Sequence, residues 1–311
     1  MKYLITGGAG FIGSHIAKEL VKRGEEVVIL DNLYTGRMER LTHIIKKIKF
    51  VKGDIRDLPL LTKEFKGVDY VLHHAALISV TESMEKKDEY NDVNVIGTRN
   101  VLEAARINKV KLVTMASSCA VYGDAKVPMC ESMDVKPISV YAINKLDDEK
   151  LCREYFEKYG LKTIIFRYFN VFGPGQDPSS PYAGVISIFI KKILNNETPT
   201  IYGDGKQTRD FVFVKNIVQA NLLACKAKSG FGELFNIGTE QEVSVNDLVS
   251  LINKDLKKNI KANHTPEREG ELKRALADSS KARKVLGFKP TIKFEEGLKE
   301  TISWMKDGSK N

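Results

Sequence analysis

Short apolar runs alternate with amphipathic stretches through the first half of the chain. The apolar runs occupy residues 2–6, 26–31, 48–54, 69–75, 110–117 and 162–170. Their length and their content of β-branched and aromatic residues are typical of strands. Two of the stretches between them, residues 11–24 and 94–108, repeat their apolar positions at the spacing of a helix with one buried face. The alternation predicts a parallel sheet with helices on both faces, which is a doubly wound α/β fold.

The pattern changes after residue 170. Residues 171–184 are rich in Gly, Pro and Ser, and loops of this length inside compact domains are often functional. The elements beyond this loop are shorter and less regular. We therefore expect a Rossmann domain over residues 1–172, to which the chain near 211–237 returns, and a smaller mixed α/β substrate-binding domain over residues 173–311.

Composition narrows the possible classes of function. The 311 residues include 49 Lys and Arg and 40 Asp and Glu, a net charge of +9, but the lysines are scattered among acidic residues. That distribution indicates a solvated surface and not a nucleic-acid binder. The four cysteines form no Cys-x-x-Cys pair and the five histidines no His-Glu-x-x-His motif, so we expect free thiols and no metal. Because no apolar stretch approaches the length of a membrane span and the chain opens on a strand, we expect a cytoplasmic protein without a membrane partner.

A glycine-rich turn follows the first predicted strand. Gly7, Gly10 and Gly13 in "TGGAGFIG" precede a helix, where glycines let the backbone approach a pyrophosphate. The second strand ends in Asp31, whose carboxylate can hold ribose hydroxyls and would repel the extra phosphate of NADP. This context predicts NAD as the cofactor. Asp54, at the end of the third strand, is placed to reach the adenine. Further cofactor contacts are expected for Phe11, Ile12, Asn32, Ile55, Ala75, Ala76, Asn94, Tyr141 and Lys145.

The pattern Tyr-x-x-x-Lys occurs three times, but only once inside an uninterrupted helical stretch. The copies that start at Tyr122 and Tyr202 run into Gly-Asp turns, whereas Tyr141 and Lys145 share one face of a predicted helix. Taken alone, such a pair predicts no more than a surface contact. Ser118 directly follows the fifth predicted strand, however, and ligands of doubly wound sheets collect at the carboxyl ends of strands.

The three side chains together predict a catalytic site. A phenol has a pKa of about 10 when unperturbed. A lysine ammonium and a positive nicotinamide ring both favour the phenolate, so we expect a lowered pKa for Tyr141. We expect Lys145 also to hold the NAD ribose, and Ser118 to hydrogen-bond the reacting hydroxyl.

These motifs together resemble those of the extended short-chain dehydrogenase/reductases, and within them the UDP-glucose and UDP-N-acetylglucosamine 4-epimerases. The resemblance spans essentially the whole chain and includes "TGGAGFIG", "VNVIGT", "SSCAVYG", "YAINK", "RYFNVFGPGQDP", "GDGKQTRDFVFV" and "REGELKRALADSSKA". It implies that Asn94 orders the active site, that Asn170 contacts the substrate diphosphate, and that Arg209 and Arg268 clamp its two phosphates. Further substrate contacts are implied for Val185 and Tyr202.

The reaction implied by the resemblance is transient oxidation of a UDP-hexose at C4. Tyr141 takes the proton of the 4-hydroxyl while NAD takes the hydride, the 4-keto sugar turns over, and the hydride returns to its other face. Related dehydratases and decarboxylases carry extra acidic residues beside the catalytic Ser or Thr. Here Cys119, Ala120 and Val121 follow Ser118. The resemblance therefore favours simple epimerisation.

The choice of sugar depends on Ala275, at a position that gates the space beside the sugar C2 in this family. A small residue implies room for an N-acetyl group, so we expect UDP-GlcNAc/UDP-GalNAc as substrates, with UDP-Glc/UDP-Gal also possible. The alternative for Ala275 is an ordinary packing role. Ile78 stands where some members have a lysine near the nicotinamide, so that contact is absent here. A UDP-glucuronate 4-epimerase and a non-catalytic NAD-binding regulator remain alternatives.

A homodimer is also implied by the resemblance. In it, the helix that carries Tyr141 and the helix around Asn100 would form a four-helix bundle with their copies. The same apolar positions also suit burial within one chain.

Overall fold

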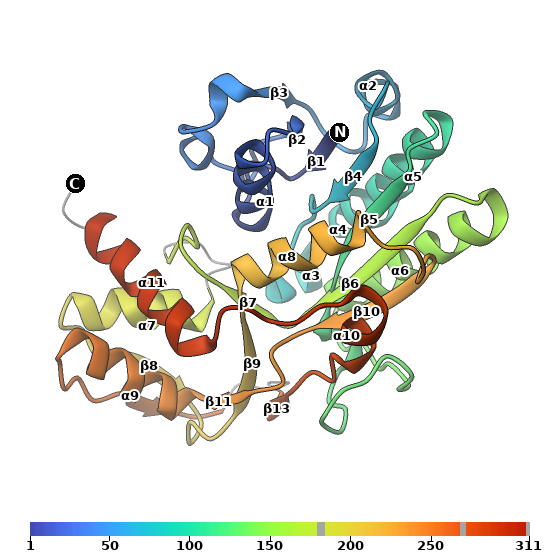
Figure 1. Ribbon diagram of the computed structural model, residues 1–311. Helices are drawn as coiled ribbons and strands as arrows, with labels where there is room; N and C mark the ends of the chain where they lie inside the picture. The colour runs from blue at the N-terminus through green and yellow to red at the C-terminus, as the bar shows by residue number, and fades with distance from the viewer. Residues whose placement is uncertain (179–183, 268–271, 309–311) are drawn as a thin grey trace.

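A seven-stranded parallel sheet forms the larger part of the molecule (Figure 1). The computed structural model describes residues 1–178, 184–267 and 272–308. In space the strands follow the order β3-β2-β1-β4-β5-β6-β10. Their bounds are β1 Lys2–Thr6, β2 Glu26–Asp31, β3 Ile48–Lys52, β4 Tyr70–His73, β5 Leu112–Ser118, β6 Thr163–Tyr168 and β10 Glu233–Ile237. The predicted doubly wound α/β fold is confirmed.

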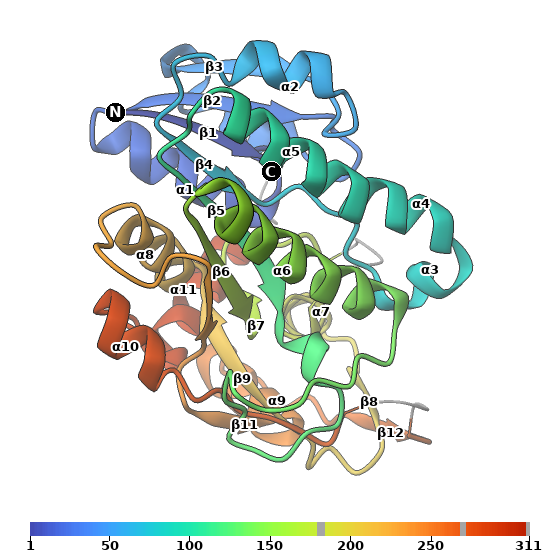
Figure 2. The same ribbon diagram turned by 90° about the vertical axis from the view of Figure 1, so that its right-hand side faces the viewer.

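Alternate residues of the central strands face opposite layers of helices, as the period of a strand requires. Leu4 packs with residues of α2 (Leu58–Glu64), α5 (Gly97–Ile107) and α6 (Val140–Tyr159). Its neighbours Tyr3 and Ile5 pack with α1 (Phe11–Lys22) and α8 (Val214–Ala224) on the other face. Figure 2 shows α5 and α6 side by side in front of the sheet, where they contact each other.

The sixth predicted strand proves to be two strands in different sheets. β6 ends at Tyr168, and β7 (Asn170–Phe172) pairs with β9 (Thr208–Phe213) in the smaller part of the molecule. The chain later returns, and β10 extends the edge of the large sheet beside β6. The predicted helix over residues 94–108 begins as a π-helix, Asp92–Ile96, and continues as α5.

The smaller part surrounds a second core. Strand β9 pairs with β11 (Glu242–Ser244), β13 (Arg274–Ala275) and β7, while β8 (Thr200–Tyr202) pairs with β12 (Asn263–Thr265). Three helices pack on these strands: α7 Val185–Leu194, α9 Val245–Leu256 and α11 Phe294–Gly308. The remaining helices are α3 Val80–Glu85, α4 Lys87–Asn91, α10 Ser280–Leu286 and the 3-10 turns Met38–Leu41, Ile45–Lys47 and Cys119–Tyr122. Among the helices of the described ranges, none has the length and apolar character needed to cross a membrane.

Candidate active site

The glycine turn between β1 and α1 brings backbone segments too close together for side chains. A Cβ at Gly13 would lie 2.3 Å from the carbonyl oxygen of Gly7. A Cβ at Gly7, whose φ is +67°, would lie 2.7 Å from the Ala75 nitrogen. Gly10 is the N-cap of α1, so no side chain stands before the helix. The partly positive N-terminus of α1 is therefore open to an anion.

A cleft beside this turn is lined by many of the expected cofactor residues. They are Gly7, Gly10, Asp31, Asn32, Asp54, Ile55, Ala75 and Ala76. The other expected cofactor residues, Phe11, Ile12, Gly13, Asn94, Tyr141 and Lys145, lie outside the cleft lining. Sequence reasoning missed Tyr34, Thr35, Arg56 and His74, which also line it. Each of these four residues lies within a few positions of a motif residue in the sequence, and this proximity could have identified them as cleft residues.

Asp31 presents a fixed carboxylate to this cleft. Its Oδ2 accepts a hydrogen bond from the Ala9 nitrogen at 2.9 Å, and its Oδ1 accepts one from the Leu33 nitrogen at 2.8 Å. Burial raises the pKa of this carboxyl, while the two backbone hydrogen bonds oppose the rise. A Cβ at Gly36 would lie 2.5 Å from Oδ1, so the backbone of Gly36 packs directly against the carboxylate and leaves no room for a side chain.

Asp54 lies near Asp31 at the rim of the same cleft. Its Oδ2 accepts a hydrogen bond from Asn32 Nδ2 at 2.9 Å and pairs with Arg56 at 2.9 Å. Hydrogen bonding to Arg56 lowers the pKa of Asp54 to about 2. The carboxylate is therefore ionised at neutral pH.

The first turn of α6 places Tyr141 close to the end of β5. Ser139 caps the helix by accepting a hydrogen bond from the Ala142 nitrogen at 3.1 Å, which is a strong start signal for a helix. The Tyr141 nitrogen donates to Ser83 Oγ at 3.2 Å, so α3 also holds this turn. The Ser118 hydroxyl, on the last residue of β5, and the charge of Lys145 both act on the Tyr141 phenol and oppose the rise of its pKa. The structure thus brings Ser118, Tyr141 and Lys145 together.

The pKa of Tyr141 in the protein alone is raised. Burial is the largest cause, and the charge of Lys145 and the Ser118 hydroxyl only partly offset it. This direction is the reverse of the one predicted from the sequence, because burial was not visible there and because the charge of Asp148 also raises the pKa of Tyr141. The positive nicotinamide ring assumed in that prediction is a further charge that the protein alone does not supply.

Lys145 is buried and pairs with Asp148, a residue that the sequence analysis did not single out. The ammonium lies 3.2 Å from Asp148 Oδ2, and the two side chains are 5% and 0% exposed. Asn94, expected to order the site, donates from its amide to the Leu77 carbonyl at 3.0 Å and accepts from the Leu77 nitrogen at 2.8 Å. That bridge fixes the segment after β4 against the π-helix that precedes α5.

Strand β9 gathers three of the residues expected to contact substrate. Asn170 on β7 pairs opposite Phe211, and Ala275 on β13 pairs opposite Arg209. The amide nitrogen of Asn170 is buried and has no hydrogen-bond partner in the described part of the chain. Arg209 lies close enough to Cys119, which follows Ser118, to oppose the rise that burial causes in the thiol pKa. Arg268 lies outside the described residues.

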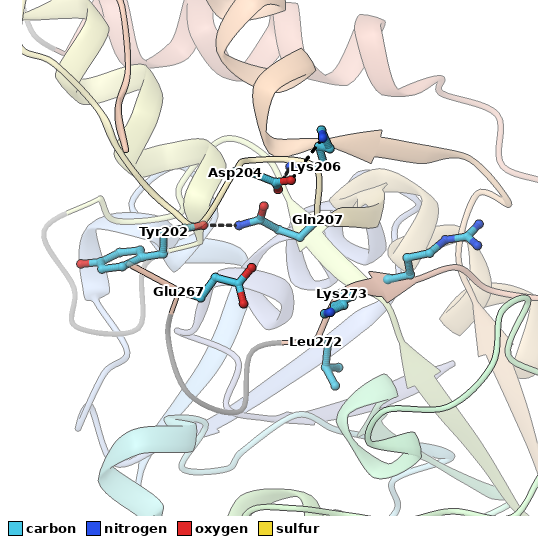
Figure 3. Close-up of a pocket in the computed structure, with 8 residues that line it drawn as sticks. Tyr202, Asp204, Lys206, Gln207, Glu267, Leu272 and Lys273 are labelled. Carbon is cyan, nitrogen blue, oxygen red and sulfur yellow. Dashed lines mark hydrogen bonds and ion pairs between the residues drawn. The ribbon is translucent and has the colours of Figure 1, made fainter. Parts of the chain in front are cut away.

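Two other expected contacts lie further out. Val185 is the first residue of α7 and packs against the second core. Tyr202 ends β8 and lines a pocket of about 290 Å³, with Glu267 beside it and Lys273 across from it (Figure 3). Gln207 Nε2 donates to the Tyr202 carbonyl at 2.8 Å and steadies the turn that borders this pocket.

Within residues 1–178, 184–267 and 272–308, no three or more His, Cys, Asp or Glu side chains are arranged to hold a metal ion. The four cysteines are free.

Comparison with known proteins gives consistent matches over the whole chain. Residues 3–238 match the profile of the NAD dependent epimerase/dehydratase family. A putative UDP-glucose 4-epimerase of Methanocaldococcus jannaschii is 44% identical over 310 residues, covering 99% of both chains. A UDP-N-acetyl-alpha-D-glucosaminuronate decarboxylase of Bacillus cytotoxicus is 39% identical and covers 98% of this chain and 97% of its own.

Among solved structures, a UDP-N-acetylglucosamine 4-epimerase from Methanobrevibacter ruminantium superposes with a TM-score of 0.95 and 40% sequence identity. The match covers 99% of this chain and 98% of that one, which was solved in complex with UDP-N-acetylmuramic acid. The similar proteins agree in using nucleotide sugars and differ in which sugar they are named for.

Proposed function

Because the chain belongs to the NAD-dependent epimerase/dehydratase family, among the nucleotide-sugar 4-epimerases, we propose that it interconverts UDP-GlcNAc and UDP-GalNAc, and also UDP-Glc and UDP-Gal. The observation that carries the reaction type is the contact of Tyr141 with Ser118 beside the buried Lys145. A phenol held between a hydroxyl and an ammonium can take a proton and later return it.

The residues around the cleft fit NAD. The glycine turn leaves backbone space that a Cβ would fill, and the Asp31 carboxylate faces the place where a ribose diol would lie. The buried Nδ1 of His74, in the same lining, has no hydrogen-bond partner in the described part of the chain. When bound, NAD supplies the hydride acceptor and donor for the reaction at C4.

The side chains of the protein supply the proton chemistry and the grip on the substrate. Tyr141 accepts the proton of the sugar 4-hydroxyl, Ser118 hydrogen-bonds that oxygen, and Lys145 favours the phenolate. The unpartnered amide of Asn170 and the guanidinium of Arg209 are suited to hold the diphosphate. A firmly held diphosphate leaves the sugar free to turn over between the two hydride transfers.

Ala275 supports the choice of an N-acetylated sugar. It is 1% exposed and lies in a small cluster with Val121 and Phe169, against which Cys119 packs. The cluster thus reaches the residue that follows Ser118. The small side chain at this position is the feature on which the choice of an N-acetylated sugar rests.

The test of the reaction type is an epimerisation assay by proton NMR with UDP-GlcNAc, UDP-Glc and UDP-GlcA. We expect Tyr141→Phe to lower kcat about 10²- to 10⁴-fold, the range for loss of a general acid–base. Tyr159→Phe, at the exposed end of the same helix, is the matched control and should keep full activity. Failure of the wild type to turn over any of the three sugars would favour the alternative of an NAD-binding regulator.

The test of sugar choice is Ala275→Tyr. We expect it to abolish turnover of UDP-GlcNAc and to preserve that of UDP-Glc, which also shows that the variant is folded. Equal loss of turnover of both substrates would mean that Ala275 has only a packing role. Loss of turnover of UDP-Glc alone would contradict the role of Ala275 as a gate for the sugar C2 substituent.

A UDP-glucuronate 4-epimerase is the second candidate. The decarboxylase of Bacillus cytotoxicus, which is named for a uronate sugar, is the observation that favours it. Exclusive turnover of UDP-GlcA in the NMR assay would establish this alternative.

The two parts of the chain divide the ligands between them in this proposal. Residues 1–172, with the returning strand β10, hold NAD, and residues 173–311 hold most of the UDP-sugar. The Tyr202 pocket then lies at the nucleotide end of the substrate site, remote from the chemistry. Tyr202→Ala should raise KM for the UDP-sugar and leave kcat nearly unchanged.

The protein also forms a homodimer in this proposal. Ile107 on α5 and Ile143 and Tyr159 on α6 are exposed, and these two helices lie side by side (Figure 2). Four helices from two chains would cover these apolar side chains. Light scattering should give twice the chain mass, and Ile143→Glu should give a monomer.

A further inference from the structure

Helix α6 buries a charged pair one turn after Tyr141. Lys145 Nζ lies 3.2 Å from Asp148 Oδ2, and the Asp148 side chain is fully shielded from solvent. The second carboxylate oxygen, Oδ1, is buried without a hydrogen-bond partner in the described part of the chain. An isolated buried carboxylate is costly, so the ammonium of Lys145 is what keeps this one charged.

A chain of buried polar groups reaches the pair from the centre of the sheet. Thr6 Oγ1 lies 2.7 Å from His73 Nδ1, and His73 Nε2 lies 2.9 Å from Thr98 Oγ1. The hydroxyl of Thr98 on α5 acts to lower the pKa of Asp148. The environment of the carboxylate is therefore set from α5 as well as from its own helix.

We propose that Asp148 is a positioning residue of the active site, whose buried carboxylate fixes the Lys145 ammonium and balances the charge that Lys145 exerts on Tyr141. The inference rests on the proposed roles of Tyr141 and Lys145. The Lys145–Asp148 pair is neutral while both are ionised, so the phenol feels only part of the ammonium's field. Protonation or removal of the carboxylate would expose the phenol to the whole field.

The electrostatics agree with this geometry. Burial raises the pKa of Asp148 to about 6, although Lys145 and Thr98 oppose that rise. Burial lowers the pKa of Lys145, but the charge and hydrogen bond of Asp148, together with the Tyr141 phenol, outweigh it, so the net direction is a rise. Asp148 itself contributes to the raised pKa of Tyr141.

Few other charges bear on the pair. The titratable groups that act on Asp148 or respond to it are Lys145, Asp147, Tyr141 and Cys152 on α6 and, through Thr98, His73 on β4. Burial lowers the pKa of His73 far below its ordinary value, so the ring is neutral. Glu149, the next carboxylate, is already bonded to Arg167. Asp147 is partly exposed and pairs with Lys150.

The experiment compares Asp148→Asn with Asp147→Asn, its exposed neighbour, in the NAD-loaded enzyme. Without the carboxylate, the phenol loses its proton more easily and so does the ammonium. We expect both limbs of the pH profile of kcat/KM to move to lower pH by about one unit or more in Asp148→Asn, and to stay in place in Asp147→Asn. Asp148→Glu, which keeps the charge, should return the limbs toward the wild type.

Two measurements do not depend on turnover. The first is the ultraviolet titration of the Tyr141 phenol, taken as the difference between each protein and its Tyr141→Phe variant, which should show the same downward shift. The second is the NAD affinity by calorimetry between about pH 7 and 9, which should fall with pH in Asp148→Asn as Lys145 loses its proton, and stay level in the wild type.

The outcomes separate this proposal from the proposed function. A protein that shows no epimerisation but shows the phenol shift would refute the function and keep the role of Asp148. Unmoved limbs and an unmoved phenol titration in a folded Asp148→Asn protein would refute the role.

A second variant covers the case in which Asp148→Asn does not fold. Thr98→Val removes the hydroxyl that stabilises the carboxylate and keeps the side-chain shape. It should shift the phenol titration in the same direction by a smaller amount, and no shift would again refute the proposal.

Discussion

The buried pair of Glu149 and Arg167 gives the sharpest test of what holds the catalytic helix in place. Arg167 Nε lies 2.8 Å from Glu149 Oε1, and its Nη2 lies 2.6 Å from Oε2. Ser117 Oγ donates to Oε1 at 2.6 Å, and the guanidinium carbon lies 4.5 Å from the centre of the Tyr122 ring. The two charged side chains are only 3% and 4% exposed. β5, β6 and α6 meet at this one carboxylate.

Glu149→Gln keeps the shape of the side chain and removes its charge. The amide can accept only at its oxygen, so its NH₂ group would face a donor of Arg167, and the guanidinium would be left buried without a counter-ion. Breaking a buried pair in this way costs about 3–5 kcal/mol. Glu154→Gln is the matched control, because Glu154 pairs with Lys158 on the same helix with side chains 44% and 62% exposed. An exposed pair at this spacing contributes about 0.3–0.5 kcal/mol.

Urea unfolding followed by circular dichroism measures both changes. We expect Glu149→Gln to lower the free energy of unfolding by several kcal/mol at an unchanged denaturant slope, and Glu154→Gln to leave it almost unchanged. The double variant Glu149→Gln with Arg167→Met should be less destabilised than the two single effects added together, since no unpaired charge remains. Equal effects of the two Glu→Gln changes, or strict additivity in the double variant, would refute the argument.

Three further predictions concern the cofactor cleft and the core. Asp31→Asn should weaken NAD about 10- to 100-fold, because a hydrogen bond to a charged group is lost, and should reduce the discrimination against NADP; calorimetry with both cofactors checks this. Burial lowers the pKa of His15 to about 4, whereas a histidine in the unfolded chain has a pKa of about 6.5. Unfolding therefore takes up a proton between these two pH values. The contribution of the neutral, buried His15 to the free energy of unfolding is complete above about pH 6.5 and is lost as the pH falls through this window. His15→Gln should therefore flatten the pH dependence of the unfolding free energy by one proton, and an unchanged slope would contradict this. Gly13→Ala should lower Tm despite a gain of about 1 kcal/mol in helix propensity, because its Cβ would lie 2.3 Å from a backbone oxygen. Gly97→Ala should lower Tm less, because its Cβ would meet only side-chain atoms of Ile55, Cδ1 at 2.5 Å and Cγ1 at 2.6 Å, and a side chain can move more easily than the backbone.

Much of the large sheet could be predicted because its strands are buried on both faces. Residues 27–31 are all buried, so the run reads as continuously apolar whichever layer each side chain faces. The glycine turn could also be predicted from the sequence, because Gly7 and Gly13 lie so close together that neither position has room for a side chain. The switch of sheets at Phe169 was not predictable, because Tyr168, Phe169 and Phe172 are all buried and burial does not reveal which sheet a strand joins.

The charged face of α6 was hidden for a different reason. The run Asp147, Asp148, Glu149 and Lys150 reads as a solvated surface, yet its two central carboxylates are buried. Helical spacing held the missing signal: positions three and four residues after Lys145 continue the face that carries Tyr141. A residue that shares a face with a proposed catalytic lysine is expected to be buried whatever its charge.

These two neighbouring carboxylates provide opposite tests of one helix. Asp148 touches the ammonium that acts on Tyr141, whereas Glu149 bonds to Arg167 and Ser117 on the strands. Both variants should lose stability, because each leaves a buried cation without its counter-ion. If interactions are as local as these distances indicate, only Asp148→Asn should move the titration of the phenol, and Glu149→Gln should leave the pH limbs in their wild-type position. Limbs that moved equally in both variants would mean that α6 shifts as a rigid body, and the roles assigned to each carboxylate would then be wrong.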